Sequence, residues 1–266
     1  MSTWVLLRGL TRECRHWGPF PELLRQEFPH ARIVVLDLPG NGEFNGAKSP
    51  TSVALMASHC RDEMARHGVP PPYRLLAMSM GAMVATAWAQ QVPAEIEACV
   101  LINTSFGNFS PLHERLRPSA WPTLLRLVLA RNTRNREQLV FSLTSRLAHA
   151  PPNLLDEWVA IRDSRPVRVG NACRQLVAAA RFRAPPCAPV PTLLLASAGD
   201  GLVNASCSKE IARRWNSAIS MQQTAGHDLP LDDGEWVARE VRDWLLAASI
   251  RKTNTSTGAA SQPLLS

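Results

Sequence analysis

Short apolar runs recur along this chain, and they do not alternate with polar residues as half-buried strands do. Segments with helical spacing separate many of these runs. Strands that are apolar on both faces and alternate with helices predict an α/β fold, with a mostly parallel sheet covered by helices on both faces. The predicted strands are Trp4–Leu7, Ile33–Asp37, Tyr73–Leu76, Ala98–Asn103, Thr192–Ala196 and Ile219–Met221.

The segment Thr51–His67 shows the helical spacing most clearly. Its apolar side chains Val53, Met56, Cys60 and Met64 are three or four residues apart, so they share one face of a helix. Gly68 and the prolines after it end the pattern. Similar arguments predict helices at Phe20–Phe28, 82–89, 205–215 and Trp236–Leu246.

This rhythm of strands and helices stops between Thr104 and Pro189. The segment is rich in arginine, is interrupted by prolines, and contains candidate helices near 121–131, 136–148, 152–162 and 170–182. It predicts a helical cap, inserted at 105–188 over the carboxyl edge of the sheet. The core would then be 1–104 and 189–248, and residues 249–266, which lack a packing face, would form a disordered tail.

Composition narrows the class of protein. The 266 residues are 45% hydrophobic and 19% charged, which describes a globular chain rather than a disordered one. No run reaches the roughly 18 apolar residues that a membrane helix needs, and no signal peptide is visible. The six cysteines are scattered without a C-x-x-C pair, which favours a reducing cytoplasm and predicts neither zinc nor a disulfide framework.

The positive charge is concentrated in one segment. The formal net charge is +7, and between His113 and Arg183 thirteen arginines face five acids, which accounts for the whole excess. A positive surface could steer an acidic carrier protein or a carboxylate towards a site, but arginines on amphipathic helices usually form a solvated face. Binding of nucleic acid is not expected, because no recognisable module or row of interleaved aromatic residues accompanies the charge.

Ser79 is the first candidate for chemistry. It lies in Ala77-Met78-Ser79-Met80-Gly81, between an apolar strand and a helix. Small residues two positions before and after a serine on such a turn are the nucleophile-elbow pattern. The turn lifts the hydroxyl clear of the sheet and points the positive end of the new helix at it.

Asp200 and His227 complete the pattern downstream. Asp200 follows the predicted strand Thr192–Ala196, and His227 follows the last predicted strand. Parallel sheets hold reactive residues beyond the carboxyl ends of their strands, so these loops and that of Ser79 should meet. The imidazole would take the serine proton, and the carboxylate would fix its tautomer. Backbone N–H groups of Leu10 and Met80 would form the oxyanion hole.

Each candidate also has an ordinary structural interpretation. Asp200 could be a turn residue beside two glycines, and His227 could cap the loop before the last helix. Among the rival acids, Asp228 should point away from its neighbour His227, and Asp37 should hold its loop by hydrogen bonds. Asp232 or Asp233 should N-cap the final helix. The other histidines, which have no partner at a strand end, should be surface or helix residues: His16, His30, His59, His67, His113 and His149.

Together these motifs resemble the α/β-hydrolase family over residues 4–248. The resemblance rests on Arg8-Gly9-Leu10, the Asp37–Gly42 loop, the Ser79 turn, Gly199–Val203 and Gly226-His227. It implies a sheet with an inserted cap and the catalytic roles of Ser79, Asp200 and His227. Two departures are Arg8 where the family commonly has His, and Ala77 where it usually has Gly. The chain also lacks two leading strands, so it resembles compact esterases of the pimeloyl-acyl-carrier-protein methyl ester type.

The resulting hypothesis is a serine esterase that cleaves a carboxylic ester of an acyl substrate, either a small molecule or one linked to a carrier protein. A thioesterase acting on acyl thioesters is the alternative among enzymes. A catalytically silent hydrolase fold that serves as a binding protein is the alternative of another class, and Arg8 in the oxyanion loop is the feature that favours it. No cofactor or metal is implied, because the chain has no ligand cluster or phosphate-binding glycine loop.

Overall fold

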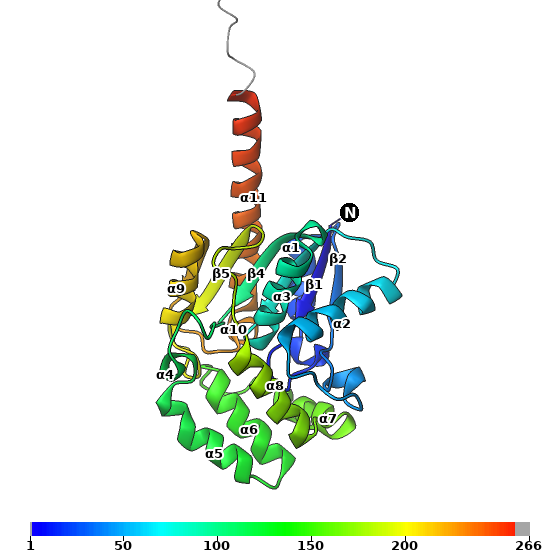
Figure 1. Cartoon of the computed structure of the whole chain (residues 1–266). Helices are drawn as coiled ribbons and strands as arrows, with labels where there is room; N and C mark the ends of the chain where they lie inside the picture. The colour runs from blue at the N-terminus through cyan, green and yellow to red at the C-terminus, as the bar shows by residue number, and fades with distance from the viewer. Residues whose placement is uncertain (1, 259–266) are drawn as a thin grey trace, which may run out of the picture.

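The computed structural model describes residues 2–258, with side chains through residue 249 (Figure 1). Its centre is a six-stranded sheet in the order β2-β1-β3-β4-β5-β6. Every neighbouring pair is parallel, so the predicted parallel α/β fold is confirmed. The strands are β1 (Thr3–Leu7), β2 (Arg32–Leu36), β3 (Tyr73–Met78), β4 (Ile96–Ile102), β5 (Thr192–Ser197) and β6 (Ala218–Gln222).

Alternate side chains of β1 show how the sheet is buried on both faces. Val5 and Leu7 pack into one apolar cluster, and Trp4 and Leu6 pack into another on the opposite face. All four are fully buried. Burial on both faces is why the strand reads as a continuous apolar run instead of an alternating one.

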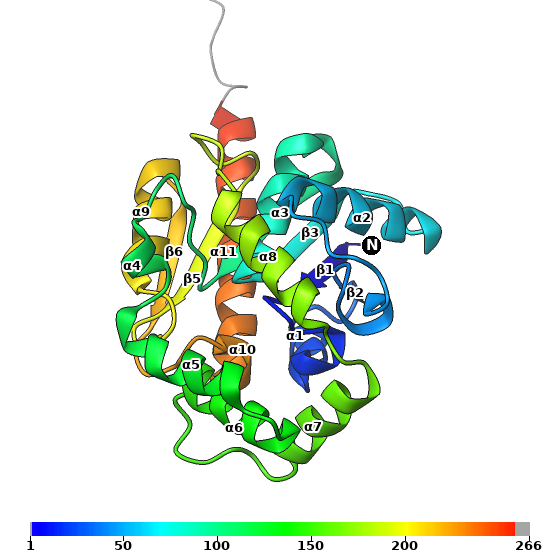
Figure 2. The same ribbon diagram turned by 60° about the horizontal axis from the view of Figure 1, so that its bottom comes forward.

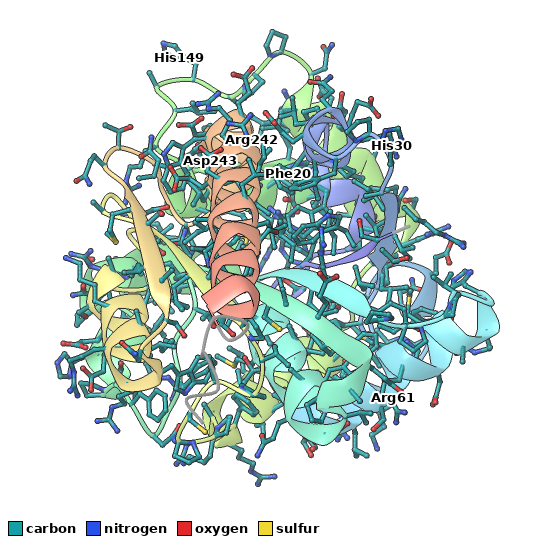
Figure 3. The ribbon with its side chains drawn as sticks, turned by 90° about the horizontal axis from the view of Figure 1, so that it is seen from above. Phe20, His30, Arg61, His149, Arg242 and Asp243 are labelled. Atoms are coloured by element: carbon teal, nitrogen blue, oxygen red, sulfur yellow. The ribbon has the colours of Figure 1, made fainter. Side chains whose placement is uncertain are left out.

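Helices cover both faces of the sheet. On one face lie α2 (Val53–Arg66), α3 (Met80–Gln91) and α9 (Ala205–Trp215). On the other face α1 (Phe20–Glu27) packs along α11 (Gly234–Gly258), and Figure 3 shows Phe20 and Arg242 at this contact. The Arg242 guanidinium reaches Glu27 of α1 at 2.7 Å. Short 3-10 helices lie in the connections: η1 (Cys14–Trp17), η2 (Gly42–Phe44), η3 (Pro93–Glu95) and η4 (Pro118–Ala120).

The chain between β4 and β5, called the insertion below, forms a helical layer beside the carboxyl edge of the sheet (Figure 2). It has a small apolar cluster of its own around Phe141, Trp158 and Ile161. Each helix predicted in this segment overlaps an observed one, while the division of the chain into a core and a cap at 105–188 remains a prediction. The helices are α4 (Leu112–Arg115), α5 (Trp121–Leu129), α6 (Thr133–Thr144), α7 (Leu154–Ser164) and α8 (Val169–Arg181), and the short α10 (Leu229–Asp232) follows β6.

The last helix is longer than the sequence pattern predicts. The helix predicted at Trp236–Leu246 continues in α11 through Gly258, so its predicted end is wrong, while the tail expected at 249–266 remains a prediction. No proline or glycine interrupts the chain between Gly234 and Gly258, and nothing local therefore ends the helix where its apolar face ends. Residues 259–266 lie outside the described residues. No helix in residues 2–258 combines the length and the apolar character needed to cross a membrane.

Candidate active site

Ser79 occupies a sharp turn between β3 and α3. Its backbone has φ +54° and ψ −118°, a conformation with positive φ that is unfavourable for a residue with a side chain. The turn is held on both sides, because the Ser79 N–H donates to the Ile102 carbonyl at 2.9 Å and its carbonyl accepts from Thr104 Oγ1 at 2.9 Å. The sequence prediction of a strand-to-helix turn at Ser79 is confirmed.

Small residues around this turn are required by close backbone contacts. A Cβ atom on Gly81 would lie 2.5 Å from the carbonyl oxygens of Leu7 and Arg8. A Cβ on Gly9 would lie 3.1 Å from the Ser79 Cβ, so the loop after β1 passes directly beside the serine. Ala77 pairs with Leu7 inside the sheet and is fully buried, which shows that its methyl group is accommodated where a glycine is usual.

The two predicted oxyanion donors belong to the two segments next to Ser79: the helix that follows it and the loop after β1. Met80 is the first residue of α3, where a backbone N–H has no partner within the helix. Leu10 follows Gly9 in the loop beside Ser79, and in residues 2–258 its N–H has no hydrogen-bond acceptor. Both N–H groups are therefore free to bind an oxygen atom of a ligand.

Asp200 and His227 form a buried pair at the ends of β5 and β6. Asp200 Oδ2 lies 2.7 Å from His227 Nδ1, and both side chains are almost fully buried. The other carboxylate oxygen accepts from the N–H groups of Leu202 at 2.8 Å and Val203 at 2.9 Å. Asp200 is thus fixed in its turn and also oriented towards the imidazole, so the turn interpretation and the pairing with His227 both hold.

Charges around His227 set its protonation. Burial lowers the pKa of the imidazole, but the charge and hydrogen bond of Asp200 and the charge of Asp228 raise it more, so the net pKa lies above the ordinary value. Arg8 acts in the opposite direction with a smaller effect. The environment therefore favours the imidazolium, the form that arises when a histidine accepts a proton.

Ser79 and His227 line the same cavity, which has a volume of about 130 Å³. Its remaining wall is mainly apolar and comes from the loop after β1, from the sheet and from two helices of the insertion. Two larger grooves elsewhere, of about 630 and 540 Å³, contain none of the predicted site residues. The apolar wall consists of Leu10, Met78, Leu124, Leu127, Val140, Leu143 and Leu202.

A buried ion pair between Arg8 and Asp228 was not foreseen from the sequence. The two guanidinium nitrogens of Arg8 donate to the two carboxylate oxygens of Asp228 at 3.0 and 2.6 Å, and both side chains are about 3% exposed. Arg8 also lies over the ring of Trp17. The pair joins the loop of Leu10 to the loop of His227. The Asp228 carboxylate is bonded to Arg8 and not to its neighbour His227, as predicted. A signal existed, because Arg8 and Asp228 each follow a strand at the same edge of the sheet.

Asn103 is a second residue that the sequence analysis missed. It follows β4, and its side-chain amide donates to Ser197 Oγ at 2.9 Å and to the His227 carbonyl at 2.9 Å. Its carbonyl oxygen accepts from the Ser197 N–H at 2.8 Å. Asn103 therefore ties three adjacent strand ends together, and its position directly after an apolar strand could have indicated this.

The remaining acids and histidines take structural positions. Asp37 accepts from the N–H groups of Cys14 and Glu43, as predicted, and Asp233 N-caps α11 through the Trp236 N–H. Asp232 instead accepts from Gly226, Ser145 and Arg146. His16 lies in η1, which agrees with the predicted surface or helix position, but its side chain is buried. It is held by the Glu13 N–H, and burial followed by the charges of Arg12 and Arg8 lowers its pKa well below the ordinary value.

The insertion is hydrogen-bonded to the loops that carry these residues. The Asp228 N–H donates to the Thr144 carbonyl at 2.7 Å, and Arg146 Nε donates to the Gly199 carbonyl at 2.7 Å. Arg117 reaches the Asp200 carbonyl at 2.8 Å. A Cβ on Gly226 would lie 2.6 Å from the Thr144 carbonyl, so this approach requires glycine before His227.

Comparison with known proteins agrees with this architecture. Residues 5–234 match the family model of the alpha/beta hydrolase fold, and the chain therefore belongs to the α/β-hydrolase family. A comparison with curated protein sequences finds no significant match.

Solved structures share the fold along most of the chain. An esterase from Thermogutta terrifontis is 19% identical with a TM-score of 0.68, covering 93% of this chain and 90% of its own. The esterase RhEst1 from Rhodococcus is 21% identical with a TM-score of 0.68, covering 91% and 90%. A protein provisionally named non-heme bromoperoxidase BpoC, from Mycobacterium tuberculosis, is 19% identical with a TM-score of 0.72, covering 93% and 92%. At these identities the likeness shows the fold alone.

Proposed function

We propose that this protein is a serine hydrolase that cleaves a carboxylic ester of an acyl substrate, with Ser79, His227 and Asp200 as its catalytic triad. One observation carries the proposal: a buried imidazole, bonded to a carboxylate at 2.7 Å, lines the same cavity as a serine held at positive φ. A structural histidine would not need to share a cavity with a strained serine.

The proposed reaction begins when Ser79 Oγ attacks the ester carbonyl carbon and His227 Nε2 takes the hydroxyl proton. Asp200 keeps the other ring nitrogen protonated and stabilises the imidazolium. The carbonyl oxygen becomes an oxyanion that accepts from the Leu10 and Met80 N–H groups. The imidazolium then gives its proton to the departing alkoxide, which leaves an acyl-enzyme that water, activated by His227, hydrolyses.

The cavity supports an acyl group that is largely apolar. Leucine and valine side chains of α5 and α6 form much of its wall. The polar lining comprises Ser79, His227, the Arg8–Asp228 pair, Thr11, Arg12 and Thr144. A cavity of 130 Å³ is small beside the few hundred Å³ of most ligand pockets, which favours a short acyl chain. Linkage to a carrier protein and cleavage of thioesters remain alternatives within the same chemistry.

Turnover of p-nitrophenyl butyrate tests the proposal. We expect a pre-steady-state burst, and Ser79→Ala should lower kcat by roughly 10⁶-fold. Ser58→Ala, which alters a half-buried serine of α2 outside the cavity, is the matched control and should leave the rate unchanged. If no ester or thioester is hydrolysed at a rate that depends on Ser79, the proposal of a serine hydrolase is wrong.

The alternatives are separated by two further measurements. Comparison of matched oxygen and sulfur esters distinguishes an esterase from a thioesterase through the ratio of their kcat/KM values. A fluorophosphonate probe distinguishes an enzyme from a silent binding protein, since only an activated serine is labelled. Well-folded protein whose Ser79 is not labelled would favour the binding protein.

A further inference from the structure

The surface of α5 has an unusual composition. Its side chains Trp121, Leu125, Val128 and Leu129, called the α5 outer face below, are 52 to 76% exposed. They are spaced four, three and one residues apart, so they lie on one side of the helix. Soluble proteins rarely leave contiguous apolar side chains of this size in water without a binding role.

The opposite side of α5 is also apolar, because Leu124 and Leu127 line the cavity of Ser79. A helix that is apolar on nearly all sides is normally buried in a core. Here the helix lies at the outer edge of the insertion, where it packs on α6 (Figures 1 and 2). We therefore expect a binding partner or a surface other than the described residues to cover the α5 outer face.

The charges around α5 indicate what kind of partner covers the α5 outer face. Between Glu114 and Glu137 the sequence has six arginines and no acid. Four of them are engaged within the protein: Arg115 and Arg117 with carbonyls of Ala179 and Asp200, Arg134 with Asp156, and Arg136 with the Ala130 carbonyl.

Arg126 and Arg131 differ from these four. Both are exposed, and neither forms an ion pair with any side chain that the structure describes. Arg126 lies within α5 itself, and Arg131 lies two residues after Leu129. The two unpaired cations therefore border the α5 outer face.

We propose that the α5 outer face docks on an anionic phospholipid surface. Leucine, valine and tryptophan side chains would enter the boundary between head groups and acyl chains, and Arg126 and Arg131 would pair with the lipid phosphates. A second copy of the chain fits less well, because a two-fold interface through this face would bring arginines of both copies together. Docking would place the lipid layer beside the helix that walls the cavity.

Vesicle sedimentation tests this surface independently of catalysis. Full-length protein carrying Ser79→Ala, which leaves the lipid intact, is mixed with vesicles of phosphatidylcholine alone or of equimolar phosphatidylcholine and phosphatidylglycerol. We expect binding to the mixed vesicles, and weaker binding when salt rises from about 0.1 M to about 1 M, because the Debye length falls from roughly 10 to 3 Å. Failure of the esterase proposal would leave this result unchanged.

Two double variants examine the two parts of the surface. Leu125→Asp with Leu129→Asp should lower the partition coefficient more than about tenfold, since charge replaces the apolar contact. Arg126→Gln with Arg131→Gln should lower it about 25-fold on mixed vesicles, at about fivefold for each arginine. The matched controls are Leu55→Asp on α2 and Arg32→Gln on β2, both exposed outside the insertion, and they should leave binding unchanged.

Several outcomes would overturn the proposal. These are equal binding to neutral and anionic vesicles, no binding to either, and an equal loss of binding in the control variants. If the unaltered protein is a dimer and the Leu125→Asp, Leu129→Asp variant is a monomer, a second copy covers the face instead of a lipid surface. Circular dichroism checks the fold of each variant. If the aspartates disturb α5, the milder substitution Val128→Ser on the same face replaces them and should also weaken binding to the mixed vesicles.

Discussion

The sheet and the insertion are stabilised by different interactions. Around the sheet, two extensive apolar clusters bury the strands on both faces. Where the insertion meets the loops of the sheet, buried polar groups form much of the contact. Arg12 after β1 pairs with the fully buried Glu137 of α6, which also pairs with Arg162 of α7. Gln175 of α8 accepts from the Thr11 N–H at 3.0 Å and donates to Asn41 at 2.7 Å.

This contrast explains how a helical layer separate from the sheet can be held in one position beside the site. Apolar packing has no preferred direction, so it stabilises the sheet without fixing the exact place of a neighbouring layer. Buried hydrogen bonds and ion pairs require particular distances and angles, and an unpaired partner is costly. The polar contacts therefore fix the positions of α6, α7 and α8 against the loops of the sheet.

After the loss expected for Ser79→Ala, the largest effect concerns the carboxylate that orients His227 at the edge of the sheet. Asp200→Asn should lower kcat on p-nitrophenyl butyrate by roughly 10⁴-fold, because an amide cannot hold His227 in the same tautomer or stabilise its charge. Steady-state kinetics measures the change. Asp233→Asn is the matched control, because Asp233 caps α11 and accepts from Gln222 but does not contact His227, and it should keep nearly full activity. A loss below tenfold for Asp200→Asn would mean that Asp200 does not orient His227 for catalysis.

The second effect concerns the contact between the two regions. Glu137→Gln leaves the guanidinium groups of Arg12 and Arg162 without a compensating charge, so the free energy of unfolding should fall by about 3–5 kcal/mol. Urea denaturation measures this. Glu235→Gln, in the exposed pair with Arg239, should change it by less than about 1 kcal/mol. Equal effects of the two substitutions would show that the buried pairs do not hold the insertion.

The smallest expected effect is on the pH dependence of activity, which is set at the loop of His227, where the sheet and the insertion meet. The pKa of His227 is raised in the folded protein, and only the neutral imidazole accepts the Ser79 proton. Activity should therefore be present at high pH and be lost as the pH falls through a value above about 6.5. A profile of kcat/KM against pH measures this limb.

The charge of Asp228 provides a test of that explanation. Asp228→Asn removes a charge that raises the pKa of His227 and leaves the charge of Arg8, which lowers it, unpaired. The acid limb should then move to lower pH, while Glu235→Gln should not move it. A limb below 6.5 in the unaltered protein would contradict the assigned environment of His227.

Much of the fold could be predicted because local patterns express it directly. Apolar runs such as Trp4–Leu7 and Thr192–Ala196 become strands because they are buried on both faces. Ser79, Asp200 and His227 could be selected because each follows a predicted strand, and parallel strands bring their carboxyl ends to one edge. The end of α11 was mispredicted because apolar periodicity marks a packed face and not the end of a helix.

What the sequence by itself determined is the succession of strands and helices and the strand ends that carry candidate chemistry, since both depend on neighbours in the chain. Only the tertiary structure decided that Arg8 pairs with Asp228, 220 residues away, and that Arg12 pairs with Glu137. Many acids could have satisfied either arginine, and no spacing in the chain distinguishes them. The choice follows from where packing places each charge, because a buried guanidinium needs the carboxylate that lies beside it.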